Sequence, residues 1–180
     1  PVNLSGKLAL QRGGRQGDPL TSQWDLNFHF SQASLDFGLR LDNITGGAKL
    51  VGGFDGQRVR SRGELSIESL QWKNFQLTEL YGPLWIDDQQ VLFGSWVDRP
   101  RRGPEGPEYA AAGEQPRPIT AQLLNGKVNA DAWISLEREP RYRLQANLVQ
   151  ADLTRFSKEN MAGQELSGQI AASVDVNGVG

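Results

Sequence analysis

Apolar side chains recur at every second position through most of the chain, which is the period of a β-strand. Two such runs lie near the N-terminus, and the segment Ser-Gln-Ala-Ser at 31–34 separates them. We predict that these runs form neighbouring antiparallel strands. The first run is Trp24, Leu26, Phe28 and Phe30, and the second is Leu35, Phe37, Leu39 and Leu41.

Turn residues divide the rest of the chain into further strands. Asp55 and Gly56 predict a tight hairpin turn, because this dipeptide tolerates positive φ angles. The polar residues 87–90 predict a second hairpin, between a strand at 84–86 and apolar residues at 91–93 and 96–97. Later strands are expected at 119–123, 126–134 and 142–148.

One helix is predicted, at residues 152–162. Asp152 is a suitable N-cap, Leu153, Phe156 and Met161 can share one face, and Gly163 can end the helix. The predicted fold is therefore mainly β. We expect an antiparallel twisted sheet, curled into an open groove or half-barrel built from repeated β-blocks, with this one short helix near the C-terminus.

The strand pattern stops between residues 98 and 118. This Pro/Gly-rich segment has little apolar surface to offset the entropy of ordering, which predicts a flexible loop. Its arginines could contact anionic lipid headgroups or another protein, or the loop could simply be solvated. The whole chain, residues 1–180, is interpreted as a single β-groove fragment of a larger repetitive protein, with this loop inside it.

The composition excludes several function classes. With 19 Lys+Arg and 21 Asp+Glu the net charge is −2, so the chain has no basic excess for binding nucleic acid. It has no cysteine, and its single histidine, His29, is expected on the polar side of a strand. Asp87 and Asp88 are better explained as a hairpin tip than as a cation site. The sequence thus predicts no enzyme, no catalytic residue, no metal site and no cofactor.

The five tryptophans all fall in predicted strands, at positions 24, 72, 85, 96 and 133. They can pack in a core with their indole N–H groups satisfied locally. Alternatively, an exposed row of them would mark a surface for glycans or lipids. The sequence leaves both interpretations open. The exposed row would correspond to a carbohydrate-binding β-sandwich.

A short phrase recurs along the chain: an apolar residue, any residue, then glycine before an apolar alternation. It occurs at Leu4 with Gly6, Leu50 with Gly52, Leu124 with Gly126, and Leu166 with Gly168. Glycine at the start of a strand lets the backbone bend or bulge. We therefore expect the chain to be a piece of a longer repetitive β-protein, cut between such blocks.

Three short motifs stand out in the C-terminal part of the chain: Ala-Asp-Leu-Thr-Arg-Phe at 151–156, Gly-Gln-Glu-Leu-Ser-Gly-Gln-Ile at 163–170 and Val-Asp-Val-Asn-Gly-Val-Gly at 174–180. With these motifs the chain resembles the repeat unit of the AsmA-like family of bacterial envelope proteins. The resemblance extends upstream through 118–126 and 142–150. The segment from 63–70 to 85–86 is similar to large planctomycete-type members, so coverage is about residues 45–180. The chain departs from the family in lacking a membrane anchor and in carrying the 98–118 loop.

The resemblance implies a periplasmic location in the cell envelope, with anchoring to the inner membrane through a segment outside this chain. It implies a groove that moves phospholipids between the inner and outer membranes and supports outer-membrane homeostasis, with acyl chains as the ligand. A structural or protein-binding module that assists outer-membrane protein assembly is the alternative. The expected lining is Trp24, Leu26, Phe28, Phe30, Leu35, Phe37, Leu39, Leu41, Leu144, Ala146 and Leu148.

Overall fold

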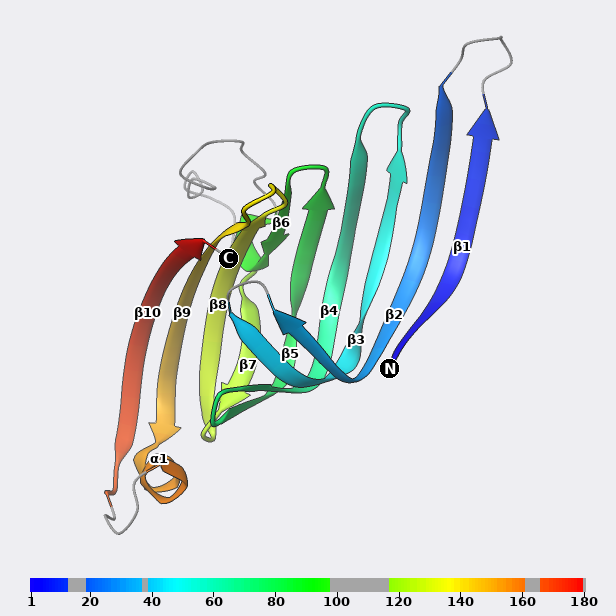
Figure 1. Ribbon diagram of the computed structural model, residues 1–180. Coiled ribbons are helices and arrows are strands. Elements are labelled where there is room, and N and C mark those ends of the chain that lie inside the picture. The colour runs from blue at the N-terminus through cyan, green and yellow to red at the C-terminus, as the bar shows by residue number, and fades with distance from the viewer. Residues whose placement is uncertain (13–18, 37–38, 98–116, 161–165, 180) are drawn as a thin grey trace.

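The computed structural model describes residues 1–12, 19–36, 39–97, 117–160 and 166–179. They form a single antiparallel sheet of ten strands with one short α-helix, which confirms the predicted mainly β fold (Figure 1). The strands are β1 (Val2–Arg12), β2 (Leu20–Asp36), β3 (Arg40–Phe54), β4 (Val59–Trp72), β5 (Phe75–Asp87), β6 (Gln90–Phe93), β7 (Ile119–Leu123), β8 (Gly126–Ser135), β9 (Arg141–Asp152) and β10 (Gln169–Val179). A 3₁₀-helix, η1 (Gly94–Trp96), follows β6, and the α-helix α1 (Leu153–Asn160) follows β9.

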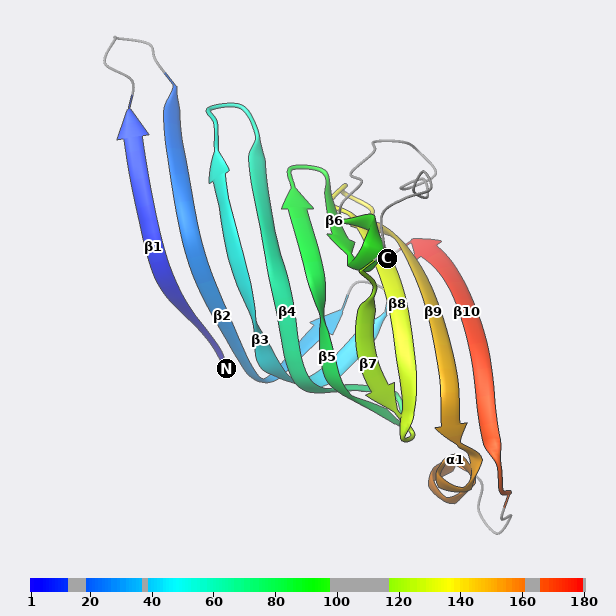
Figure 2. The same cartoon turned by 180° about the vertical axis from the view of Figure 1, so that it is seen from behind.

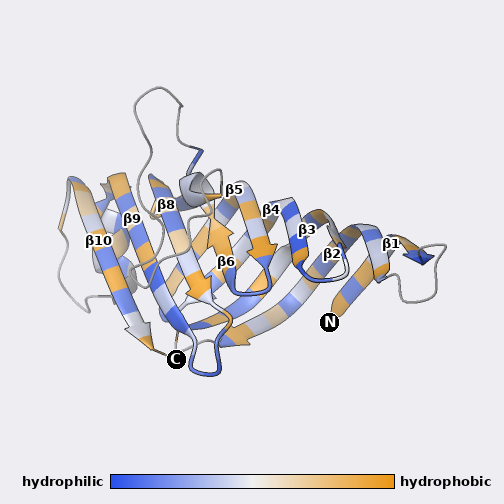
Figure 3. Cartoon of the chain, turned by 90° about the horizontal axis from the view of Figure 1, so that it is seen from above, coloured by the Kyte–Doolittle hydropathy of each residue, from blue (hydrophilic) through white to orange (hydrophobic). Residues whose placement is uncertain are grey.

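The sheet is a meander whose order follows the chain, from β1 at one edge to β10 at the other. The short strands β6 and β7 both lie between β5 and β8, with which each of them pairs. Seen from above, the sheet curves but does not close (Figure 3). The view from behind shows β1 and β10 at its opposite ends (Figure 2). The fold is therefore compatible with the predicted open groove.

The strand register separates an apolar face from a polar one. Directly paired residues of antiparallel strands project to the same side of a sheet. One row of paired residues crosses nine strands: Gly6, Leu26, Leu50, Gly63, Leu84, Phe93, Ala132, Leu144 and Val176. We call the face that carries this row the inner face and the opposite one the outer face. Hydrophobic and hydrophilic residues accordingly alternate along the strands (Figure 3).

The predicted connection at residues 31–34 is wrong, because β2 runs through it to Asp36. Instead, the strands bend at a line of residues with left-handed backbone, Gln32, Asn43 and Glu79, at φ 52°, 52° and 53°. The register shifts beside each of them. One extra residue at such a bulge bends the strand. We call this line the crease, and beyond it the ends of β2 and β3 turn across the front of the sheet (Figure 1).

The crease also changes the spacing of the inner-face residues. Following the register through the bulges, the inner face passes from Phe30 to Ala33 in β2 and from Leu41 to Ile44 in β3. The interval there is three residues instead of two, so simple alternation across residues 31–34 assigns the wrong face. The bulge keeps the apolar side chains on one side while the strands change direction.

Replacing Gln32 by glycine is expected to stabilise the fold by up to about 1 kcal/mol, because glycine adopts a positive φ angle without the steric cost of a Cβ atom. The matched control is Gln23→Gly in the same strand, outside the crease, which should destabilise by about 0.5–1 kcal/mol. Urea unfolding of both variants measures the difference. Equal destabilisation by the two changes would contradict the left-handed backbone at Gln32.

A compact core lies on the outer face, around β6 and β8. It contains Leu92, Trp96, Val97 and Trp133, with Trp85 packed against it. Trp96 belongs to η1, so its assignment to a strand is wrong: the chain turns back over the sheet at Gly94. The Trp133 indole N–H donates to Gln90 Oε1 (2.9 Å). This core covers the middle of the outer face.

The predicted hairpins and the predicted helix cap are present. Asp55 Oδ1 accepts the backbone N–H groups of Gln57 and Arg58 in the β3–β4 turn, and Asp87 Oδ1 accepts those of Gln89 and Gln90.

Asp152 N-caps α1, since its Oδ1 accepts the N–H groups of Thr154 and Arg155. Hydrogen bonds from the Arg155 and Thr154 backbone lower the pKa of Asp152, as expected for a capping carboxylate.

The recurring glycines differ in where they lie relative to the strand starts. Gly126 begins β8 and Gly168 directly precedes β10, as predicted for strand starts. The same prediction is wrong for Gly6, which lies inside β1, and for Gly52, which lies near the end of β3. Residues 98–116 of the predicted 98–118 loop, and the predicted helix end at Met161 and Gly163, fall outside the described residues. In the part of the chain that the structure describes, no helix is long and apolar enough to cross a bilayer.

Candidate hydrophobic groove

The inner face is almost free of polar groups. Among the described residues that the register places on it, the polar side chains are Ser22, Ser61 and Tyr142, with Arg12 as the one charged group, at the end of β1. The outer face, by contrast, carries charged residues such as Lys49, Arg62 and Glu64. The two faces are thus suited to different surroundings, one apolar and one aqueous.

Burial on the inner face increases from the edges of the sheet toward its centre. Leu50 and Leu84 in central strands are only 9% and 4% exposed, whereas Leu4 and Leu8 in β1 are 59% and 63% exposed. At the other edge, Val176 in β10 is 38% exposed. The curvature of the sheet shelters the centre, while the apolar surface stays open along both edges.

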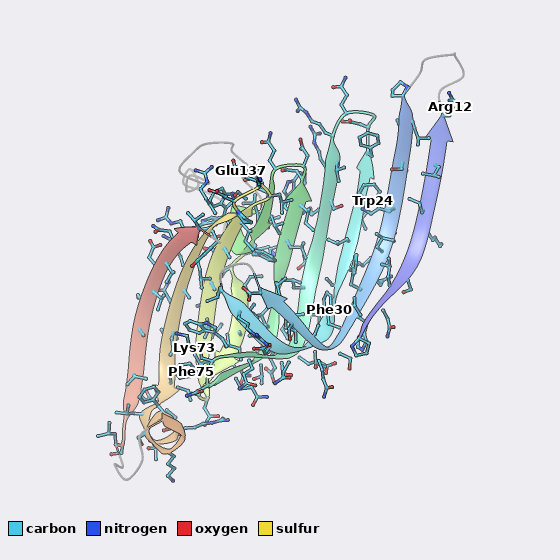
Figure 4. The ribbon with its side chains drawn as sticks, viewed as in Figure 1. Arg12, Trp24, Phe30, Lys73, Phe75 and Glu137 are labelled. Atoms are coloured by element: carbon cyan, nitrogen blue, oxygen red, sulfur yellow. The ribbon has the colours of Figure 1, made fainter. Side chains whose placement is uncertain are left out.

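Aromatic packing closes one end of the inner face. The Phe156 ring of α1 stacks on Phe75 of β5, with ring centroids 6.2 Å apart and planes 11° from parallel. Trp72 of β4 packs beside Phe75 at 6.4 Å. Figure 4 shows Phe75 next to α1 and shows Arg12 and Glu137 at the opposite end of the molecule, where hairpin turns protrude. The inner face, which we call the trough, therefore has a helix at one end.

Aromatic side chains of β2 lie along this trough. The Trp24 indole N–H donates to Ser61 Oγ of β4 (2.9 Å), so the indole reaches across Gly52 of the intervening strand. Phe28 and Phe30 stack with centroids 6.4 Å apart. Glycine opposite a large aromatic residue makes room for it on a crowded concave surface.

The predicted lining residues lie on the inner face where they are described. Trp24, Leu26, Phe28 and Phe30 are half-buried on it before the crease, and Leu144, Ala146 and Leu148 lie on it in β9. Leu35 and Leu41 pair beyond the crease, Leu39 lies in the adjoining turn, and Phe37 is outside the described residues. That this set contacts lipid stays a prediction.

Several inner-face residues escaped the sequence prediction. Exposed examples in the two edge strands are Leu4, Leu8 and Leu10 of β1 and Val174 and Val176 of β10. Their alternation was visible in the sequence, yet only the register shows that they share a face with Trp24 and Leu144.

The outer face carries His29 and the Asp87 hairpin, two of the polar features considered in the sequence. His29 is exposed there, paired in register with Asn3 and Gly47, as expected for the polar side of the strand. The Asp87 carboxylate accepts backbone hydrogen bonds within its own hairpin. No cluster of three or more metal-ligating side chains occurs within the described ranges.

The tryptophans divide between the two faces and do not form one exposed row. Trp85, Trp96 and Trp133 belong to the outer-face core, whereas Trp24 and Trp72 lie on the inner face. The packed interpretation therefore applies to three of them, and the row expected for a glycan-binding surface is not formed.

Comparison with known proteins identifies no family model that matches the chain, no similar curated protein and no similar solved structure.

Proposed function

We propose that this chain is a non-enzymatic groove domain of an AsmA-like protein of the bacterial envelope, and that its inner face holds phospholipid acyl chains in transit between the inner and outer membranes. The observation that carries the proposal is the inner face itself. It belongs to a curved, open sheet (Figure 3), is nearly free of charge from edge to edge, and is exposed to solvent along both edge strands.

The energetics favour an apolar ligand. An apolar sheet face in water needs a cover, either another protein layer or a bound molecule. Each methylene of an acyl chain that is transferred from water to such a face contributes about 0.8 kcal/mol. A trough lined by Leu4, Leu8, Leu26 and Phe28 can thus bind chains of different length without specific polar contacts. The location in the periplasm and the anchor in the inner membrane are part of the same proposal.

The test is to isolate the chain from a bacterial envelope fraction and to identify bound lipid by native mass spectrometry and organic extraction. We expect stoichiometric phospholipid in the wild-type chain. The variant Leu4→Asp/Leu8→Asp places two carboxylates on the exposed part of the inner face, so bound lipid should fall at least about tenfold, because a charge is costly against acyl chains.

The matched control, Asn3→Asp/Ser5→Asp, adds the same charge to the outer face of the same strand and should retain its lipid. Circular dichroism checks that both variants stay folded. A folded wild-type chain that carries no lipid, or equal lipid loss in both variants, would contradict the proposal.

A second candidate function rests on the backbone of β1. This eleven-residue strand pairs only with β2 among the described strands, so the N–H and C=O groups along its other edge are free to accept an added strand. A module that assists outer-membrane protein assembly would bind unfolded strand peptides and carry no lipid. Peptide binding by a lipid-free chain is the result that favours this alternative.

A further inference from the structure

A hollow of about 440 Å³ lies near the tips of β1 to β4. Its lining includes Ala9, Gln11, Gln23, Gly53, Arg58 and Arg60. Four of these form one row of the register, from Ala9 through Gln23 and Gly53 to Arg60, on the outer face. Ala9 and Gly53 have little or no side chain, whereas the polar side chains around them are longer. The surface is therefore recessed at these two positions.

The arginines of this hollow differ from other surface arginines in their ion pairing. Arg40, Arg117, Arg141 and Arg143 each form an ion pair with a carboxylate. Within the described part of the chain, neither Arg58 nor Arg60 does so, and both side chains are exposed.

One carboxylate, that of Asp55, also lines the hollow. Its Oδ1 accepts the N–H groups of Gln57 and Arg58 within the hairpin turn. Two guanidinium groups and one carboxylate give the hollow a net charge of about +1 at neutral pH. It is therefore suited to an anion.

We propose that this hollow binds the phosphate group of a phospholipid whose acyl chains lie in the trough, an inference that rests on the proposed function. Guanidinium groups bind phosphate oxygens through paired, charge-assisted hydrogen bonds. The side-chain amides of Gln11 and Gln23 supply further donors.

Position favours a headgroup over a free anion. Ser22 and Phe54, which pair in register on the inner face, also border the hollow. The hollow thus adjoins the apolar surface at the strand tips, at the end of the sheet away from α1 (Figure 1). An amphiphile can place its phosphate against Arg58 and Arg60 while its chains extend along the trough.

The experiment compares three probes by isothermal titration: dihexanoyl phosphatidylglycerol, neutral dihexanoylglycerol and inorganic phosphate. They are titrated into the wild-type chain, into Arg58→Gln/Arg60→Gln, and into Arg62→Gln/Arg138→Gln. The last variant is a control, since it removes the same charge from outside the hollow. For the wild type we expect the phospholipid to bind about tenfold tighter than the neutral lipid, the effect of charge-assisted hydrogen bonds.

In Arg58→Gln/Arg60→Gln this preference should vanish while binding of the neutral lipid stays unchanged, and the control should keep the preference. An unchanged preference in Arg58→Gln/Arg60→Gln overturns the inference. Arginine-dependent binding of inorganic phosphate without any phospholipid preference assigns the hollow to a free phosphate and overturns the headgroup assignment. Failure of the neutral lipid to bind any variant counts instead against the proposed function, so the two failures are distinguishable.

Discussion

Replacing Leu92 by alanine is expected to lower the free energy of unfolding by about 3 kcal/mol. The Leu92 side chain is fully buried, at 0% exposure, in the outer-face core with Trp96, Val97 and Trp133. Alanine would remove buried methyl groups and leave a cavity, and rigid aromatic neighbours can collapse into it only partly. Urea unfolding followed by tryptophan fluorescence measures the loss.

The control for this change is Val149→Ala in β9. Val149 is 40% exposed, so the same kind of truncation should cost well under 1 kcal/mol there. If Leu92→Ala costs no more than Val149→Ala, then residues 94–97 do not pack on the sheet as the structure shows. The difference between the two variants thus tests the main contact between η1 and the strands.

Replacing Gly63 by alanine is expected to destabilise the fold by about 2 kcal/mol or more, the cost of overpacking a tight site. Gly63 lies on the inner face of β4, opposite Leu50. A Cβ atom at this position would overlap the backbone carbonyl oxygen of Lys49 and approach Leu50 Cδ2 to 2.8 Å. Since the obstacle is backbone, β3 and β4 would have to shift relative to each other.

The neighbouring outer-face residue provides the control. Glu64 is exposed, and its ion pair with Arg117 is a surface pair, so Glu64→Ala should change stability by less than about 1 kcal/mol. Both variants are measured by thermal unfolding at one protein concentration. A Gly63→Ala chain as stable as Glu64→Ala would show that the inner faces of β3 and β4 are less closely packed than described.

The sequence predicted the local features of the fold. Alternation identified strands, and Asp55, Asp87 and Asp152 marked two hairpins and a helix start, because each of these carboxylates binds N–H groups two or three residues away. Such hydrogen bonds depend only on residues that are close together in the sequence. The sequence was therefore sufficient for them.

The crease and the position of Trp96 were not predicted, because each depends on distant partners. Residues 31–34 are polar enough for a loop, yet they stay in the sheet because β3 bends beside them at Asn43. Trp96 has the spacing of a strand residue, yet its place is set by Leu92 and Trp133, the latter far along the chain. Tertiary packing here overrides local pattern.

The sequence predicted apolar strand faces for the candidate site, but it did not predict which strands share one face. Alternation placed Trp24 to Phe30 on one face of a strand and Leu144 to Leu148 on one face of another. That these two faces are the same, and that β1 and β10 extend them, follows only from the eight strand pairings that link β1 to β10. The arginine hollow depends on the same pairings, since Ala9, Gln23, Gly53 and Arg60 lie far apart in the sequence.

The position of the outer-face core affects which substitutions the fold tolerates. Its best-packed aromatic cluster lies on the side of the sheet away from the trough, at Leu92, Trp96 and Trp133. Residues along the trough's rim, such as Leu8 and Val176, contribute little to that cluster. New side chains at the rim can therefore alter the width and chemistry of the trough at small thermodynamic cost, so the fold tolerates substitution there.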